Sequence, residues 1–295
     1  MLIKIFDKDI AIKEFGCALG SHEPRCIPAS VNLFVKVTEG CNAHCLFCSN
    51  AGHHTNKSGV FDHDKLWRIV DELQAKDILV NRINITGGEP STRPDVVGEI
   101  LSRASLSSYD RIHIHLNTNG LLPQSQELMK HERWNSISIS MHHYNIDRLS
   151  ELYGTKIDSE ALQFKGINRS IVNLSCNLIK GYIDSALAVE KMLQAAVEMF
   201  IPRLGFVSLM KVNDFCRDRY VDFSDIDFES IPHLYFTQSR NRGANCKCSN
   251  YMYNYKGRPL EVYMRNYANP QYCESSLLFD GQYLRQGFHN DNIIY

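Results

Sequence analysis

The feature that most constrains the fold is a regular alternation of strand-like and helix-like segments between residues 31 and 212. Short runs rich in β-branched residues alternate with longer segments whose apolar residues recur every three or four positions. Such a series predicts parallel strands joined by right-handed helical crossovers. The expected strands are VNLFVKVT (31–38), RINIT (82–86), RIHIHLNT (111–118), SISISMH (136–142), SIVNLSCNLI (170–179) and RLGFVSLMKV (203–212).

Three of the segments between these strands have clear helix signals. Asp62 and Ser185 are expected N-caps, and Pro94 with Asp95 opens another helix. The apolar residues expected on the buried stripes are Leu66, Ile69, Val70 and Leu73, then Val96, Val97, Ile100 and Leu101, and then Val189, Leu193, Val197 and Phe200.

About six such units are fewer than the eight of a closed barrel. We therefore expect an α/β fold, a partial (β/α)6 TIM-like barrel over residues 31–212, with its chemistry at the carboxyl ends of the strands. Residues 213–295 are expected to form a small β-rich extension, because turn residues at KGRP and DGQ lie between strand-like runs. Residues 1–30 are expected to be an N-terminal extension with a hairpin around DKD.

Charge and composition exclude several classes of function. The 295 residues carry a net charge of −1, which predicts neither a nucleic-acid partner nor a membrane-surface partner. No apolar run has the length of a membrane span or the character of a signal peptide. We therefore expect a cytoplasmic protein, where ten cysteines favour metal sites over disulfides.

Three cysteines are crowded directly after the first barrel strand. Cys41, Cys45 and Cys48 lie in VTEGCNAHCLFCSN, residues 37–50, at spacings of four and three. Zinc would require a fourth ligand, for which His44 is available. An iron–sulfur cluster held by three thiolates would leave one iron open to a substrate or cofactor.

This loop resembles the signature of the radical S-adenosylmethionine (SAM) superfamily, C-x3-C-x-aromatic-C, with Phe47 as the aromatic residue. The resemblance covers roughly residues 31–212, because further landmarks of the superfamily follow in order. They are GGEP (87–90), NTNG (117–120), SISMH (138–142) and VNLSCNLIKG (172–181).

The resemblance implies an enzyme in which the three thiolates hold a [4Fe–4S] cluster and SAM chelates the fourth iron. An electron from the cluster would cleave SAM and give a 5′-deoxyadenosyl radical, which removes a hydrogen atom from the substrate. It also implies a low-potential electron donor such as flavodoxin or ferredoxin.

The resemblance further implies a set of cofactor-binding residues. Gly87 and Gly88 would bring backbone carbonyls to the SAM ammonium group, and Glu89 would bond that group or brace the loop. Polar residues at the other strand ends would contact the carboxylate or the ribose of SAM. Phe47 would pack near its adenine. Lys180 would either pair with the SAM carboxylate or lie exposed. The polar residues are Thr118, Asn119, Ser140, Asn173 and Ser175.

Alternation in residues 172–178 places Asn173, Ser175 and Asn177 on one strand face, expected to line the barrel interior. Cys176 would face the helices as a buried thiol. At the fourth strand end, His142 and His143 are catalytic candidates, because one of them facing the interior could accept a proton from the substrate radical. A hydrogen-bonded surface histidine is the alternative.

The tail carries a second group of cysteines. Cys246, Cys248 and Cys273 resemble the ligands of the auxiliary-cluster element called the twitch domain, as in SPASM-type enzymes, although their spacing departs from that pattern. Cys216 is the candidate fourth ligand. A structural zinc or unligated thiols are the alternatives, and Cys17 and Cys26 are expected to be incidental thiols.

An auxiliary cluster suits an oxidative outcome, and the resemblance to related architectures implies oxidative modification or cross-linking of a ribosomally made peptide as the predicted activity. The first alternative is oxidation or rearrangement of a small molecule such as a nucleotide or aminosugar. The second is a non-catalytic iron–sulfur or zinc scaffold, which the intact glycine-rich loop and polar strand ends disfavour.

Overall fold

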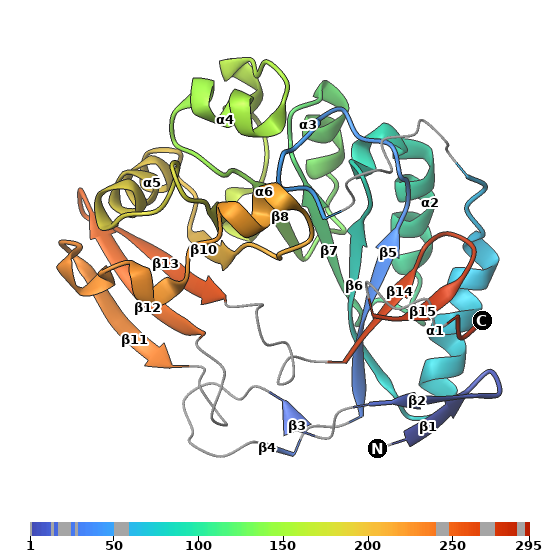
Figure 1. Ribbon diagram of the computed structural model, residues 1–295. Helices are drawn as coiled ribbons and strands as arrows, with labels where there is room; N and C mark the ends of the chain where they lie inside the picture. Colours follow the sequence, from blue (N-terminus) through green and yellow to red (C-terminus); the bar gives the residue numbers. More distant parts are fainter. Residues whose placement is uncertain are drawn as a thin grey trace.

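One continuous curved sheet organises the molecule (Figure 1). The computed structural model describes residues 2–12, 15–16, 25–26, 29–49, 59–239, 248–265, 275–287 and 293–295. The sheet has the strand order β11-β12-β13-β10-β9-β8-β7-β6-β5-β14-β15. Its central strands are β5 (Ser30–Lys36), β6 (Leu79–Thr86), β7 (His113–Thr118), β8 (Ser136–Ser140), β9 (Val172–Leu178) and β10 (Arg203–Ser208).

These central strands are all parallel to their neighbours, as the βα alternation predicts. The crossovers contain α1 (His63–Ala75), α2 (Pro94–Ala104), α3 (Pro123–Met129), α4 (Ile146–Tyr153) and α5 (Ala186–Glu198), and α6 (Asp214–Asp218) follows β10. The predicted α/β class with a parallel sheet is therefore confirmed.

The C-terminal strands extend this sheet at both edges. β13 (Arg258–Arg265) pairs in parallel with β10, and β14 (Ser275–Phe279) pairs in parallel with β5. The predicted hairpins are present, with β12 (Ser249–Tyr255) antiparallel to β13 and β15 (Leu284–Gln286) antiparallel to β14. β11 (Leu234–Ser239) pairs with β12 at one edge. The C-terminal region is β-rich as predicted, while the three-part division of the chain stays a prediction.

The helix caps follow the sequence signals. The Asp62 side chain accepts a hydrogen bond from the Lys65 amide at 2.8 Å, and the Ser185 hydroxyl accepts one from the Ala188 amide at 3.3 Å. The prediction is wrong for one expected core residue. Phe200 lies beyond the last residue of α5 at a φ of 59° and is 56% exposed, because the chain reverses there and Ile201 packs into the core instead.

The two faces of the parallel strands differ in chemistry. One face is apolar and buried, and helices α1 and α5 contact β6 and β10. We call the opposite side the inner face. On β9, Val172, Leu174, Cys176 and Leu178 are fully buried, whereas the intervening Asn173, Ser175 and Asn177 are half-buried, as alternation predicts. Burial raises the pKa of the Cys176 thiol, so this cysteine is a core residue.

The predicted N-terminal hairpin is also present. β1 (Leu2–Ile5) pairs antiparallel with β2 (Lys8–Ala11), and the ring of Phe6 in its turn stacks on Tyr295 with centroids 3.8 Å apart. Short strands β3 (Phe15–Gly16) and β4 (Arg25–Cys26) form a separate pair. Each helix that the structure describes is too short or too polar to cross a bilayer.

Candidate functional site

The cysteine loop, residues 41–48, follows β5 at the carboxyl edge of the sheet and is fastened to the end of α4. The amides of His44 and Leu46 donate hydrogen bonds to the carbonyls of Tyr153 and Leu152, at 2.8 and 3.1 Å. Gly154 ends α4 at a φ of 59°, where an added Cβ would lie 2.9 Å from the His44 carbonyl oxygen. Gly154 is therefore required both by its left-handed conformation and by the close approach of the loop.

The three thiols of this loop are partly buried and influence one another. Burial raises the pKa of Cys45, and the neighbouring Cys48 and Cys41 raise it further. Burial also raises the pKa of Cys41, whose sulfur accepts a hydrogen bond from the Ala43 amide at 3.4 Å. These are thiols that iron would deprotonate on binding.

The two metal centres considered from the sequence require different arrangements of their ligands. Within the described part of the chain, no three His, Cys, Asp or Glu side chains converge as the ligands of a single ion would. A four-iron cluster takes each thiolate on a different iron, so its ligands stand around a cube instead of meeting at one point. Cys41, Cys45 and Cys48 supply the three thiolates that such a cluster requires.

The GGEP loop packs directly on the stem of the cysteine loop. The amides of Gly88 and Glu89 donate to the carbonyls of Thr38 and Gly40, both at 2.8 Å. An added Cβ would lie 2.5 Å from the Thr38 oxygen at Gly87, where φ is 147°, and 2.0 Å from the Gly40 oxygen at Gly88. Neither position can carry a side chain without moving the cysteine loop.

Glu89 joins three loops. Its carboxylate is 1% exposed and accepts hydrogen bonds from the Thr118 hydroxyl and the Asn119 amide, both at 2.7 Å, and from the Ser91 amide at 3.1 Å. The Asn119 side chain in turn donates to the Asn42 side chain at 2.8 Å. Glu89 therefore braces the loop, one of its two predicted roles, and Thr118 and Asn119 are occupied by these contacts.

Phe47 lies on the fourth strand end. Its ring meets His142 edge to face, with centroids 4.5 Å apart. The His142 Nδ1 accepts a hydrogen bond from the Asn177 amide at 3.0 Å, and burial lowers the pKa of His142 to about 3. Its imidazole is neutral at pH 7, and the hydrogen bond assigns the ring proton to Nε2. Beside it, Tyr153 donates through its hydroxyl to the Ser140 carbonyl at 2.6 Å.

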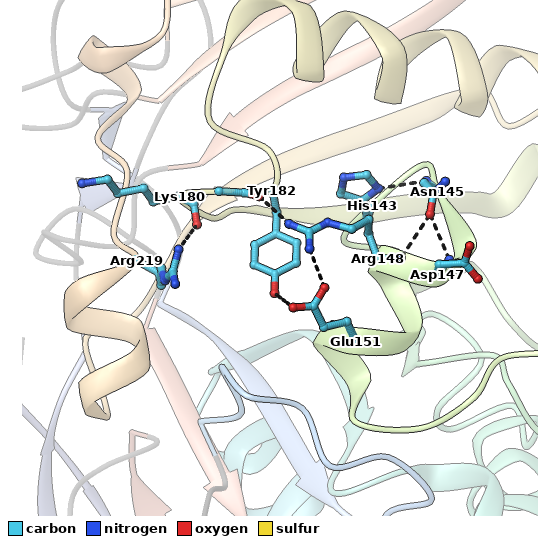
Figure 2. Close-up of polar contacts among 9 residues, drawn as sticks. His143, Asn145, Asp147, Arg148, Glu151, Lys180, Tyr182 and Arg219 are labelled. Carbon is cyan, nitrogen blue, oxygen red and sulfur yellow. Dashed lines mark hydrogen bonds and ion pairs between the residues drawn. The ribbon is translucent and has the colours of Figure 1, made fainter.

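His143 and Lys180 lie in a polar group that links α4 to the segment after β9 (Figure 2). The His143 Nδ1 accepts a hydrogen bond from the Asn145 amide at 2.9 Å, and burial lowers the pKa of His143. The Lys180 carbonyl accepts a bond from the Arg219 guanidinium at 3.3 Å, while its side chain is exposed and points away from the group.

The rest of this polar group holds α4 in place. The Arg148 guanidinium donates to Glu151 at 2.5 Å and to the Gly181 carbonyl at 2.7 Å, and the Tyr182 hydroxyl donates to Glu151 at 2.7 Å. Because α4 ends in the carbonyls that anchor the cysteine loop, these contacts also position that loop. The sequence did not single out these residues, although Gly154 after a helical segment is a recognisable cap signal.

Cys216 lies beside the cysteine loop. It is fully buried on α6, its thiol donates to the Phe47 carbonyl at 3.7 Å, and Cys48 contributes to its raised pKa after the larger effect of burial. Its neighbour Asn213 donates to the Leu46 carbonyl at 3.2 Å. Cys248 is buried, whereas Cys246, Cys273 and Cys17 lie outside the described residues, and only the backbone of Cys26 is described. The auxiliary ligand set thus stays a prediction.

A family model matches the part of the chain that contains the candidate site. Residues 35–169 match the Radical SAM superfamily model, over the part of the chain that contains the cysteine loop, the GGEP loop and the NTNG loop. Residues 35–169 therefore carry a radical SAM domain. The enzymes of this superfamily use a [4Fe–4S] cluster together with SAM.

The relatives of this chain have names that indicate different substrates. The probable GTP 3′,8-cyclase of Methanocaldococcus jannaschii is 26% identical over 284 residues, which are 89% of this chain and 87% of that protein. The PqqA peptide cyclase of Methylorubrum extorquens is 31% identical over 86 residues, which are 29% of this chain and 22% of that protein. The names of these two relatives therefore indicate a nucleotide substrate for one and a peptide substrate for the other.

A solved radical SAM structure has the same fold. The radical SAM methyltransferase from Sphaerobacter thermophilus superposes with a TM-score of 0.53 at 17% identity, over 66% of this chain and 60% of that one. This likeness confirms the partial-barrel architecture predicted for the radical SAM domain.

Proposed function

We propose that the protein is a radical SAM enzyme that removes a hydrogen atom from a substrate held on the inner face of the sheet. The observation that carries the proposal is the connection through Glu89, which fixes the cysteine, GGEP and NTNG loops to one another at the ends of neighbouring strands. When bound, the cluster supplies the electron that divides SAM into methionine and a 5′-deoxyadenosyl radical.

In this proposal Cys41, Cys45 and Cys48 hold the cluster. Their support is the loop itself, which is anchored to α4 through His44 and Leu46. Such anchoring lets the loop take up iron with little loss of conformational freedom.

The backbone of the GGEP loop would bind the SAM ammonium group. Gly87 and Gly88 keep this part of the site free of side chains, and carbonyl oxygens are suitable acceptors for an ammonium. Since the carboxylate of Glu89 already accepts three hydrogen bonds, its role is to hold the loop in shape. Ser140, Asn173 and Ser175 lie half-buried on the inner face, where they would meet the ribose or substrate.

Phe47 is still proposed to pack near the adenine of SAM. The Lys180 side chain is exposed, so it is the least favoured of the residues proposed to contact the SAM carboxylate. His142 and His143 both accept a backbone hydrogen bond at Nδ1, so each offers an N–H at Nε2. They are suited to donate a hydrogen bond to a substrate or cofactor, and accepting a proton at Nε2 would first require a change of tautomer.

For the substrate, oxidative modification of a peptide remains the proposal from the sequence, with an auxiliary cluster held by Cys246, Cys248 and Cys273. A nucleotide is the second candidate, and the match that covers 89% of this chain favours it. A low-potential flavodoxin or ferredoxin would supply the electron in either case.

Anaerobic reconstitution with iron and sulfide, followed by reduction in the presence of SAM, tests the proposal. We expect 5′-deoxyadenosine and methionine in chromatography of the reaction mixture. Iron binding without cleavage of SAM would instead indicate a non-catalytic scaffold, and stoichiometric zinc without a cluster would exclude radical chemistry.

A further inference from the structure

A hydrogen-bonded turn joins the second and third thiols of the cysteine loop. The amide of Cys48 donates to the carbonyl of Cys45 at 3.1 Å, and Leu46 and Phe47 are the two central residues of the turn. The orientation of the peptide group between two such central residues distinguishes the common types of β-turn. Because the turn separates Cys45 from Cys48, its type also fixes how these two residues are placed relative to each other.

Elements outside the loop hold this turn from two sides. The side-chain amide of Asn213 donates to the Leu46 carbonyl at 3.2 Å, and the Leu46 amide donates to the carbonyl of Leu152 on α4 at 3.1 Å. The ring of Phe47 packs against both the main core and a second, smaller apolar cluster. The members of the smaller cluster are Leu152, Ile179, Tyr182, Leu209 and Cys216. The peptide groups on both sides of Leu46 are therefore bonded to elements outside the loop.

The Asn213 side chain makes two hydrogen bonds of different kinds. Its Oδ1 accepts a bond from the Cys216 amide at 2.8 Å, which caps the N-terminus of α6, and its Nδ2 donates to the Leu46 carbonyl. Serine and aspartate cap helices about as well as asparagine does. Aspartate has no N–H in its side chain, however, and the serine hydroxyl lies one bond closer to its own backbone. The amide group of Asn213 is therefore required by the cysteine loop and not by α6.

The conformation of Phe47 agrees with this role of Asn213. Phe47 does not have a positive φ, which the second central residue of a type II turn would require. Rotating the peptide group between Leu46 and Phe47 would break the bond to Asn213 and force Phe47 into a conformation that L-residues rarely adopt. Asn213 therefore strengthens a preference of the turn, and the loop would sample more than one geometry without it.

We propose that Asn213 is a positioning residue for the cluster, because it fixes the peptide group between Leu46 and Phe47 and thereby the relative positions of Cys45 and Cys48. The inference rests on the proposed function, in which both thiolates bind one cluster. A four-iron cluster takes each thiolate on a different iron, so its ligands must keep a definite separation. A turn held in one geometry supplies that separation and limits the conformational entropy lost when the cluster binds.

Hydrogen exchange in the full-length chain, prepared without iron, SAM or reductant, tests this proposal. Asn213→Ser and Asn213→Asp both keep the cap of α6 and remove the donor to Leu46. Mass spectrometry should show amide exchange about fivefold faster in a peptide covering residues 44–49, because losing one hydrogen bond changes an opening equilibrium by about that factor. Asn168→Ser, at the N-cap of the short helix Arg169–Ile171, is the matched control and should exchange like the wild type in residues 44–49.

The reconstituted protein provides a second readout that a purely structural role would not change. The EPR spectrum of the reduced cluster, recorded without SAM, should contain more than one component in Asn213→Ser, because the thiolates are no longer held in a single arrangement. If Asn213 only caps α6, both the exchange of the loop and this spectrum should match the wild type, since serine preserves the cap.

Several results would overturn the proposal. They are exchange like that of the wild type in Asn213→Ser, an unchanged EPR spectrum in that variant, or equal acceleration in Asn168→Ser. An effect in Asn213→Asp alone would assign the change to the added charge and would also overturn it. If Asn213→Asp does not fold, Asn213→Ser decides the question by itself. Because the exchange measurement uses neither iron nor SAM, failure of SAM cleavage would leave its result unaffected.

Discussion

The Glu89 carboxylate accepts a hydrogen bond from the Asn119 amide at 2.7 Å. The two residues belong to loops that follow β6 and β7, and the Asn119 side chain continues the connection to Asn42 in the cysteine loop. One buried carboxylate thus makes the geometry of the GGEP loop depend on that of the cysteine loop.

Replacing Glu89 with Gln should weaken this connection. The amide group of Gln donates where the carboxylate accepts, so the Asn119 amide or the Thr118 hydroxyl loses its partner at a cost of about 1–3 kcal/mol. We expect a lower unfolding midpoint in denaturant and weaker SAM binding. Glu160→Gln on the exposed surface is the control, and equal behaviour of the two variants would contradict the bracing role.

Gly88→Ala should disturb both halves of the site together. Its Cβ would lie 2.0 Å from the Gly40 oxygen, so the stem of the cysteine loop must move. Iron content and SAM affinity should therefore both fall, as iron assay and equilibrium binding would show. Gly98→Ala on α2 meets nothing within 4 Å and should stabilise the helix by about 0.5–1 kcal/mol. Full iron content in Gly88→Ala would count against the packing described.

The stability of the protein should fall in mild acid because of its buried histidines. Burial lowers the pKa of His142 to about 3, whereas an unfolded histidine has a pKa of about 6.5. Below pH 6.5 the unfolded state binds a proton at this histidine that the folded state does not bind. The free energy of unfolding therefore decreases as pH falls towards 3. The limiting slope is about 1.4 kcal/mol per pH unit for each such histidine.

Denaturant titrations of His142→Gln and wild type between pH 7.5 and 5 would measure this effect. The variant should lose stability less steeply with falling pH, because one of the histidines that protonate only on unfolding is gone. His131→Gln, at an exposed position, is the control. Parallel pH profiles of His142→Gln and wild type would show that His142 does not titrate as described.

The auxiliary cluster makes a separate prediction. Anaerobic reconstitution should give about eight irons per chain if both clusters have four irons. Cys248→Ser should lose about half of this iron and all product formation, while 5′-deoxyadenosine still forms in an uncoupled reaction. Four irons per wild-type chain, or zinc bound in the C-terminal region, would contradict the prediction of an auxiliary cluster.

Much of the fold could be predicted from local sequence, because strand alternation and helix caps are local signals. Asp62, Ser185 and the two faces of β9 are as expected. The pairing of β14 with β5 joins segments about 245 residues apart, and periodicity carries no information about such partners. The prediction that Phe200 is buried was wrong for a related reason, since the apolar spacing continues past the residue where the helix ends.

The residues of the candidate site could be predicted from the sequence better than the contacts that join them. Cys41, Cys45 and Cys48 could be identified by spacing, and Gly87 and Gly88 by their position after a strand. The three hydrogen bonds of Glu89 depend on loops that only the folded sheet brings together. The position of Cys216 against Phe47 likewise follows from the packing of α6 and has no signal in the sequence.

Formation of 5′-deoxyadenosine by the cysteine-loop variant tests the central claim most directly. The reduced wild type should form 5′-deoxyadenosine from SAM, and replacing Cys41, Cys45 and Cys48 together with Ala should abolish it. Cys216→Ser is the matched control, because its hydroxyl can still donate to the Phe47 carbonyl beside the loop. We predict 5′-deoxyadenosine from wild type and Cys216→Ser and none from the triple variant, whereas reductive cleavage of SAM by the triple variant would contradict the account.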